Sequence, residues 1–131
     1  MKRLFRTIVT IAAIAGICYG AIAAWRIYSY HFDDLGFDRT AWLKNTGNHD
    51  SKNPRGQMAQ DLRDRVLRKG MTKEEVSRLL GKPDWWGGTP PPKDVLEYNL
   101  GNWAWCPICP DVLDVHLDKT GRLTRVEITE H

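Results

Sequence analysis

The residues of this chain with the clearest capacity for chemistry are Cys106 and Cys109, which frame the stretch WCPIC. Two cysteines separated by two residues form the redox pair of thioredoxin-type enzymes, supply half of a structural zinc site, or close a small disulfide ring. The elements before and after the pair decide between these three kinds of chemistry.

A redox or metal role does not fit the surrounding sequence well. A thioredoxin-type thiol lies at the start of a helix, but Pro110 follows Cys109 directly and the next residues alternate as a strand. A structural zinc ion needs four protein ligands, and the nearest further one is His116, between two aspartates. We therefore predict a local disulfide between Cys106 and Cys109 in an oxidising compartment. An exported thiol-disulfide or metal-binding protein that uses the same pair stays open as the alternative function.

No other group of residues suggests catalysis. The sequence shows no paired carboxylates with a plausible base, no Ser–His pair and no phosphate-binding loop. We therefore predict that the protein is not an enzyme, with no catalytic residue, no cofactor and no metal ion.

The start of the chain is typical of a membrane signal. The basic stretch MKRLFR precedes residues 7–25, TIVTIAAIAGICYGAIAAW, which contain no charged residue. About 20 apolar residues cross a bilayer as a helix, and basic residues before the span remain in the cytoplasm. We predict that residues 1–30 anchor the protein in the bacterial inner membrane by a single pass, with the C-terminal domain in the periplasm. Cleavage near Ala23, which would release the protein into the periplasm, stays open as the alternative.

Charge separates this anchor from the rest of the chain. Residues 1–30 hold four basic residues and no acidic one, whereas the remaining 15 basic and 16 acidic residues sum to −1. A nucleic-acid partner would require basic residues clustered on a folded surface, so we predict none. Residues 31–53 are polar with scattered aromatics, and we predict a linker with a short helical turn near residues 40–44.

Two amphipathic helices are predicted after the linker. The first begins at the cap Asn53 and ends at Gly70. The second begins at Thr72, which forms a capping box with Glu75, and ends at Gly81. Apolar residues recur at helical spacing in both: Met58, Ala59, Leu62, Val66 and Leu67 in the first, and Val76, Leu79 and Leu80 in the second.

Three segments with strand-like alternation complete the chain. They read VLEYNL from residue 95, VLDVHLD from residue 112 and RLTRVEIT from residue 122, with a tight turn at Gly121 before the last. Two helices can cover one face of such a sheet. We predict an α+β domain over residues 54–131, with two helices packed on a three-stranded antiparallel sheet (ααβββ), preceded by the N-terminal transmembrane helix.

Three stretches, GMTKEEVSRLLGKPD, LEYNLG and LDVHLDKTGRLTRVEI, resemble the SmpA/OmlA family of BamE-like envelope domains. The resemblance covers residues 68–128. It implies the ααβββ fold and a non-enzymatic role in binding other envelope proteins or lipid, in outer-membrane protein assembly or envelope integrity. The chain departs from the family in lacking a lipoprotein signal and in the loop DWWGGTPPPKD after Pro83.

Four tryptophans lie in the loops on either side of the first predicted strand: Trp85, Trp86, Trp103 and Trp105. Tryptophan is the residue most enriched at binding hot spots, so these four are the candidate partner-binding residues. The alternative is that they enlarge the core of a small domain. Together these patterns predict a membrane-anchored interaction domain of the cell envelope, without catalysis, whose partner is an envelope protein or lipid.

Overall fold

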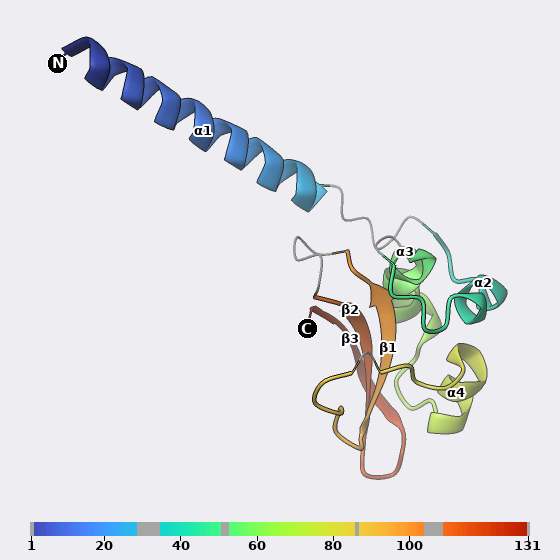
Figure 1. Cartoon of the computed structure of the whole chain (residues 1–131). Helices are drawn as coiled ribbons and strands as arrows, with labels where there is room; N and C mark the ends of the chain where they lie inside the picture. The colour runs from blue at the N-terminus through green and yellow to red at the C-terminus, as the bar shows by residue number, and fades with distance from the viewer. Residues whose placement is uncertain (1, 29–34, 51–52, 86, 104–108, 131) are drawn as a thin grey trace. The chain divides into compact units, whose positions relative to one another are not determined.

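The computed structural model describes residues 2–28, 35–50, 53–85, 87–103 and 109–130, and the chain divides into two compact units. The first unit holds the helix α1 (Lys2–Tyr28) (Figure 1). Among the described residues, no helix combines the length and the apolar character needed to cross a membrane. Some side chains of residues 7–25 are not among those that the structure describes, so the predicted membrane span stays a prediction.

The second unit is an α+β domain. Its helical elements are α2 (Arg39–Lys44), α3 (Pro54–Asp61), the π-helical turn η1 (Leu62–Val66) and α4 (Lys73–Leu80), and its strands are β1 (Val95–Gly101), β2 (Asp111–Leu117) and β3 (Leu123–Glu130). The predicted α+β class and the three-stranded antiparallel sheet are confirmed, but more than two helical elements precede the sheet.

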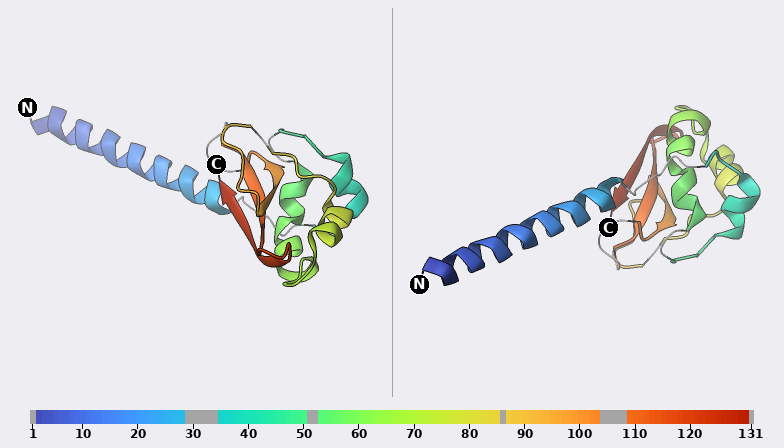
Figure 2. Two further views of the ribbon diagram at one scale, coloured as in Figure 1. Left: turned by 90° about the horizontal axis from the view of Figure 1, so that it is seen from below. Right: turned by 90° about the horizontal axis from the view of Figure 1, so that it is seen from above.

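The helices of the domain lie on one face of the sheet, as two views at right angles to Figure 1 show (Figure 2). The strand order is β1-β2-β3, with Tyr98 opposite Leu113 and Leu113 opposite Ile128. Alternation along each strand therefore presents one apolar face to the helices. The core between the two layers includes Trp42, Met58, Leu62, Val76, Leu80, Leu96, Tyr98, Leu113, Val115 and Leu123.

Residues 35–50 belong to the folded domain, whereas the sequence predicts a linker there. Asp38 caps α2 by accepting a hydrogen bond from the Ala41 amide at 2.8 Å. Trp42 belongs to the same helix. It is fully buried and donates from its indole Nε1 to the Leu80 carbonyl at 3.0 Å. The domain therefore begins well before residue 54. The short helical turn predicted near residues 40–44 corresponds to α2, but a helix of six residues is too short to show a sustained apolar period, so the sequence did not indicate that it packs in the core.

The first predicted helix is shorter than expected and changes type along its length. It starts where predicted, with the Asn53 side chain accepting from the Arg55 amide at 3.0 Å. From Leu62 it continues as a π-helical turn, closed by the hydrogen bond from the Leu67 amide to the Leu62 carbonyl at 2.8 Å. The helical segment therefore ends at Val66 and not at Gly70.

The second predicted helix has the expected start. Thr72 Oγ1 accepts from the Glu75 amide at 3.2 Å, and Glu75 Oε2 accepts from the Thr72 amide at 2.8 Å. The capping box is therefore confirmed. Val76 and Leu80 of this helix are buried in the core.

Candidate functional site

A buried ion pair anchors the loop that joins α4 to β1. Arg55 is fully buried, and its Nη1 lies 2.7 Å from Asp84 Oδ2. The same guanidinium donates to the Trp42 carbonyl and to Thr46 Oγ1, each at 2.8 Å, and stacks 4.5 Å from the Trp42 ring centre. Burial lowers the pKa of Arg55, and the charge of Asp84 opposes that shift. The pair joins α2, α3 and the loop at one point.

Asp84 is held by more than this ion pair. Its carboxylate accepts from the Gly47 amide at 2.8 Å and from the Asn99 amide at 3.1 Å. Its own amide donates to the Glu97 carbonyl at 3.2 Å, at the edge of β1. The position from which the rest of the loop departs is therefore set by several contacts.

The structure divides the four predicted binding tryptophans. Trp85, directly after Asp84, exposes 42% of its surface. Trp103 instead packs on α3, so closely that a Cβ on Gly56 would lie 2.1 Å from its Nε1, and this nitrogen donates to the Leu100 carbonyl. Trp86 and Trp105 lie outside the described residues. Trp85 therefore remains a binding candidate, whereas Trp103 contributes to packing.

The cysteine pair is only half described. Cys109 is half-buried and Cys106 lies outside the described residues, so the predicted disulfide stays a prediction. The residues after Cys109 lead directly into β2, as the alternating pattern predicts, and not into a helix. The helix N-terminus that activates a thioredoxin-type thiol is therefore not formed there. Within the described part of the chain, no group of three or more His, Cys, Asp or Glu side chains could hold a metal ion.

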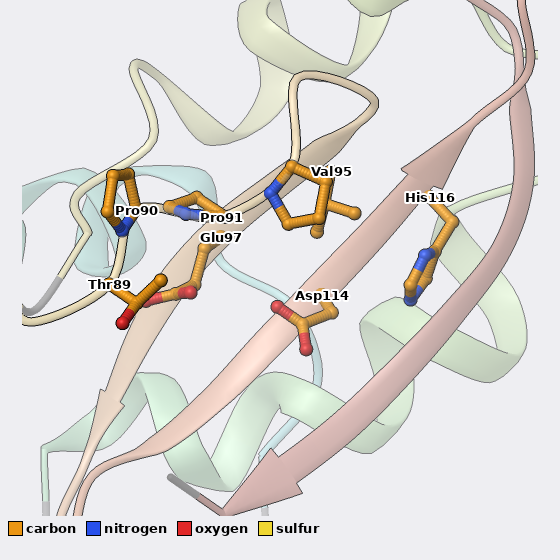
Figure 3. A pocket seen from close by; sticks show the side chains of 8 residues that line it. Thr89, Pro90, Pro91, Val95, Glu97, Asp114 and His116 are labelled. Atoms are coloured by element: carbon orange, nitrogen blue, oxygen red, sulfur yellow. The ribbon is translucent and has the colours of Figure 1, made fainter.

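A pocket of about 300 Å³ lies against the face of the sheet that points away from the helices. Its floor is formed by the outward residues of β1 and β2, and one wall is formed by the proline-rich part of the loop between α4 and β1 (Figure 3). The described residues that line it are Thr89, Pro90, Pro91, Pro92, Val95, Glu97, Asp114 and His116. Almost every residue of β1 and β2 is buried, including most of those on this outer face.

The pocket is acidic. The register of the sheet places Glu97 directly opposite Asp114, and Asp114 directly opposite Glu127. Glu97 is 6% exposed and Asp114 is 8% exposed, while Thr129 Oγ1 donates to Asp114 Oδ2 at 2.7 Å. At the rim, His116 Nε2 lies 3.1 Å from Glu127 Oε2. Glu127 Oε2 also lies 3.5 Å from Arg125 Nη2, so its charge is partly compensated.

Comparison with known proteins assigns no family to this geometry. No family model matches the chain, and neither a curated protein nor a solved structure matches it. The SmpA/OmlA resemblance therefore stays a prediction from the quoted motifs.

Proposed function

We propose that this protein is a membrane-anchored interaction domain of the bacterial cell envelope, which binds a partner protein through the loop between α4 and β1. Residues 7–25 form the anchor, and the folded domain lies in the periplasm. The SmpA/OmlA resemblance favours a partner that takes part in outer-membrane protein assembly or envelope integrity. No catalytic step is part of this proposal.

The anchor is supported by the start of the chain. The basic stretch MKRLFR precedes an uncharged apolar segment, as in proteins whose N-terminus stays in the cytoplasm. In the structure, the side chains of Ile11, Ile14 and Ile17 on α1 are exposed. Exposed apolar surface of this kind is stabilised when lipid or protein covers it.

The observation that carries the proposal is the exposure of Trp85 next to the anchored Asp84. A large aromatic side chain that is exposed to water lacks the stabilisation of apolar burial, and contact with a partner supplies it. Because the preceding residue is held by the Arg55 ion pair, part of the ordering cost of binding has already been met in the free protein.

Site-specific photocrosslinking tests this proposal in intact cells. We expect benzoylphenylalanine at position 85 of the full-length chain to give discrete crosslinked protein products. The matched control carries the same group at Lys119, an exposed residue of the turn before β3. Products that are absent at position 85, or identical from both positions, would contradict a binding surface at this loop.

A further inference from the structure

We propose that the open part of the β3 edge binds an extended segment of the partner protein, which adds a fourth, antiparallel strand to the sheet. The inference rests on the proposed function for the source of that segment. β3 lies at one edge of the sheet, since the strand order is β1-β2-β3 (Figure 1). An edge strand presents a row of backbone N–H and C=O groups with which another chain can pair.

The other edge of the sheet is covered by the domain itself. Along β1, the Glu97 carbonyl accepts from the Asp84 amide at 3.2 Å, and the Asn99 amide donates to the Asp84 carboxylate at 3.1 Å. The Val95 amide donates to the Pro92 carbonyl at 3.0 Å. The loop between α4 and β1 therefore occupies the positions that an added strand would need.

The register shows which backbone groups of β3 face outward. Along an antiparallel strand, the N–H and C=O groups of successive residues turn alternately to one side and to the other. Glu97 turns its carbonyl away from β2, so Asp114 opposite it turns towards β3, and Glu127 turns back towards β2. The backbone groups of Val126 and Ile128, on either side of Glu127, therefore point away from the sheet.

Only the start of β3 has these outward groups paired. The Leu123 amide donates to the Met71 carbonyl at 2.7 Å, and the Leu123 carbonyl accepts from the Gly70 amide at 2.8 Å. Within the described part of the chain, no comparable backbone partner lies against Val126 or Ile128 on the outer side. Both side chains are half-buried at the margin of the core. The open part of the edge therefore lies beyond Leu123.

The charges along the open edge define the partner segment. Arg125 and Glu127 alternate with the core-facing residues of β3, and their side chains are 61% and 43% exposed. A segment with an acid opposite Arg125 and a base opposite Glu127 gains two cross-strand pairs. Aliphatic residues opposite Val126 and Ile128 would complete the burial of these side chains. The pattern of the segment, read from its N-terminus, is therefore aliphatic, basic, aliphatic, acidic.

A second copy of the chain fits this edge less well. Arg125 faces Glu127 of a second β3 in only one symmetric register. That register places Thr129 of the second copy opposite Leu123, where Met71 already lies. Registers shifted further along the edge place Glu127 opposite Glu127 or Thr129 of the second copy, and like charges opposite one another are destabilising. A different protein therefore meets the charge pattern better.

Peptide titration of the isotope-labelled full-length protein in neutral detergent micelles, followed by amide NMR shifts, tests the inference. The probe TTVKVE, blocked at both ends, carries the expected pattern, and its control TTVEVK exchanges the two charges. We expect saturable shifts of the Val126 and Ile128 amides with TTVKVE, and binding at least about threefold weaker with TTVEVK. Equal binding of the two peptides, or shifts of neither amide, would overturn the inference.

N-methylated probes test the backbone pairing. In the proposed register, both valines of TTVKVE turn their N–H groups towards β3, whereas the lysine and the second threonine turn theirs away. We expect methylation of the two valine nitrogens to abolish binding, and methylation of the lysine and second threonine nitrogens to preserve it. Equal losses from the two patterns would show that no strand is added.

A protein with exchanged charges locates the peptide. Arg125→Glu together with Glu127→Arg should reverse the preference, so that TTVEVK binds more tightly than TTVKVE. The control is Lys119→Glu, in the exposed turn before β3, which should keep the original preference. An unreversed preference would place the peptide elsewhere and overturn the inference. If the exchanged protein does not fold, the N-methylated probes on the unaltered chain still decide the question.

The outcomes separate this inference from the proposed function. Absent shifts at Val126 and Ile128 together with crosslinks from position 85 would overturn the added strand and leave the interaction domain standing. Peptide binding at the edge without those crosslinks would overturn the role of the Trp85 surface but not the chemistry of the edge. Shifts of the same two amides on dilution of the protein without peptide would show pairing with a second copy and overturn the assignment to a partner.

Discussion

Arg55 Nη1 lies 2.7 Å from Asp84 Oδ2, and this contact joins two segments 29 residues apart in the chain. The arginine is fully buried, whereas the aspartate keeps 12% of its side chain exposed. Removing one partner from a buried ion pair leaves the other charge without compensation, which costs more than the pair contributes. The contact therefore controls both the stability of the domain and the position of the loop that carries Trp85.

We expect Asp84→Ala to lower the free energy of unfolding by about 3 kcal/mol, since Arg55 would remain buried without its carboxylate. The measurement is chemical denaturation of the full-length chain in detergent. The matched control is Asp64→Ala, which removes the exposed pair with Arg63 and should have a much smaller effect, because exposed ion pairs contribute little to stability. Equal effects of the two substitutions would contradict the anchoring role of Asp84.

Trp42→Ala should destabilise the domain by about 3–5 kcal/mol, because it removes a fully buried aromatic side chain from the core. Trp42→Phe keeps most of the apolar surface but loses the hydrogen bond to the Leu80 carbonyl. It should therefore cost less than the alanine change. An unchanged denaturation midpoint for Trp42→Ala would contradict this packing and support the prediction that residues 31–53 form a linker.

We expect Asp61 to make the stability of the domain sensitive to acid. The pKa of its carboxyl is lowered by the hydrogen bond from the Phe37 amide at 2.6 Å and then by Arg65. A carboxyl with a lowered folded pKa adds stability above its ordinary pKa, and that stability is lost as the pH falls through the lowered value. We expect Asp61→Asn to make unfolding less dependent on pH below about pH 4. The same acid dependence in both proteins would show that other carboxyls are responsible.

The predicted disulfide can be tested by mass spectrometry of the alkylated protein, in which Cys106 and Cys109 should resist labelling until reduced. A ring of this size contributes about 2 kcal/mol at most. Changing both residues to serine should therefore leave the domain folded with a slightly lower denaturation midpoint. A pair that is labelled readily, together with insulin-reductase activity or one bound zinc ion per chain, would instead support the alternative function.

The proposed single-pass membrane topology predicts that alkaline phosphatase fused to the C-terminus is active and stays with the membrane after a high-salt wash. Phosphatase requires the oxidising periplasm, so activity reports export of the domain. A fusion that lacks residues 2–28 is the control and should be inactive. Active fusion recovered in solution, with an N-terminus at Ala24 or Trp25, would show that the segment is cleaved.

Features that depend on neighbouring residues could be predicted from the sequence. Thr72 and Glu75 form their capping box because both lie in the first turn of one helix, and Asn53 caps α3 for the same reason. Alternating apolar and polar residues predict each strand. Glycine at the position that needs a positive φ predicts the turn at Gly121. These elements, with the order of helices before strands, are sufficient for the α+β class and the antiparallel sheet.

Features that join distant segments were decided by the tertiary structure. Trp42 reads as one aromatic residue in a polar stretch, and only its contact with α4, 38 residues later, makes it part of the core. Nothing in the order of residues indicates that Arg55 is buried, because its partner Asp84 belongs to a loop. The pocket depends likewise on strand register, which sets Glu97 opposite Asp114, and on the loop that covers this face. Sequence patterns report which groups are near along the chain, whereas burial and charge pairing depend on which groups meet after folding.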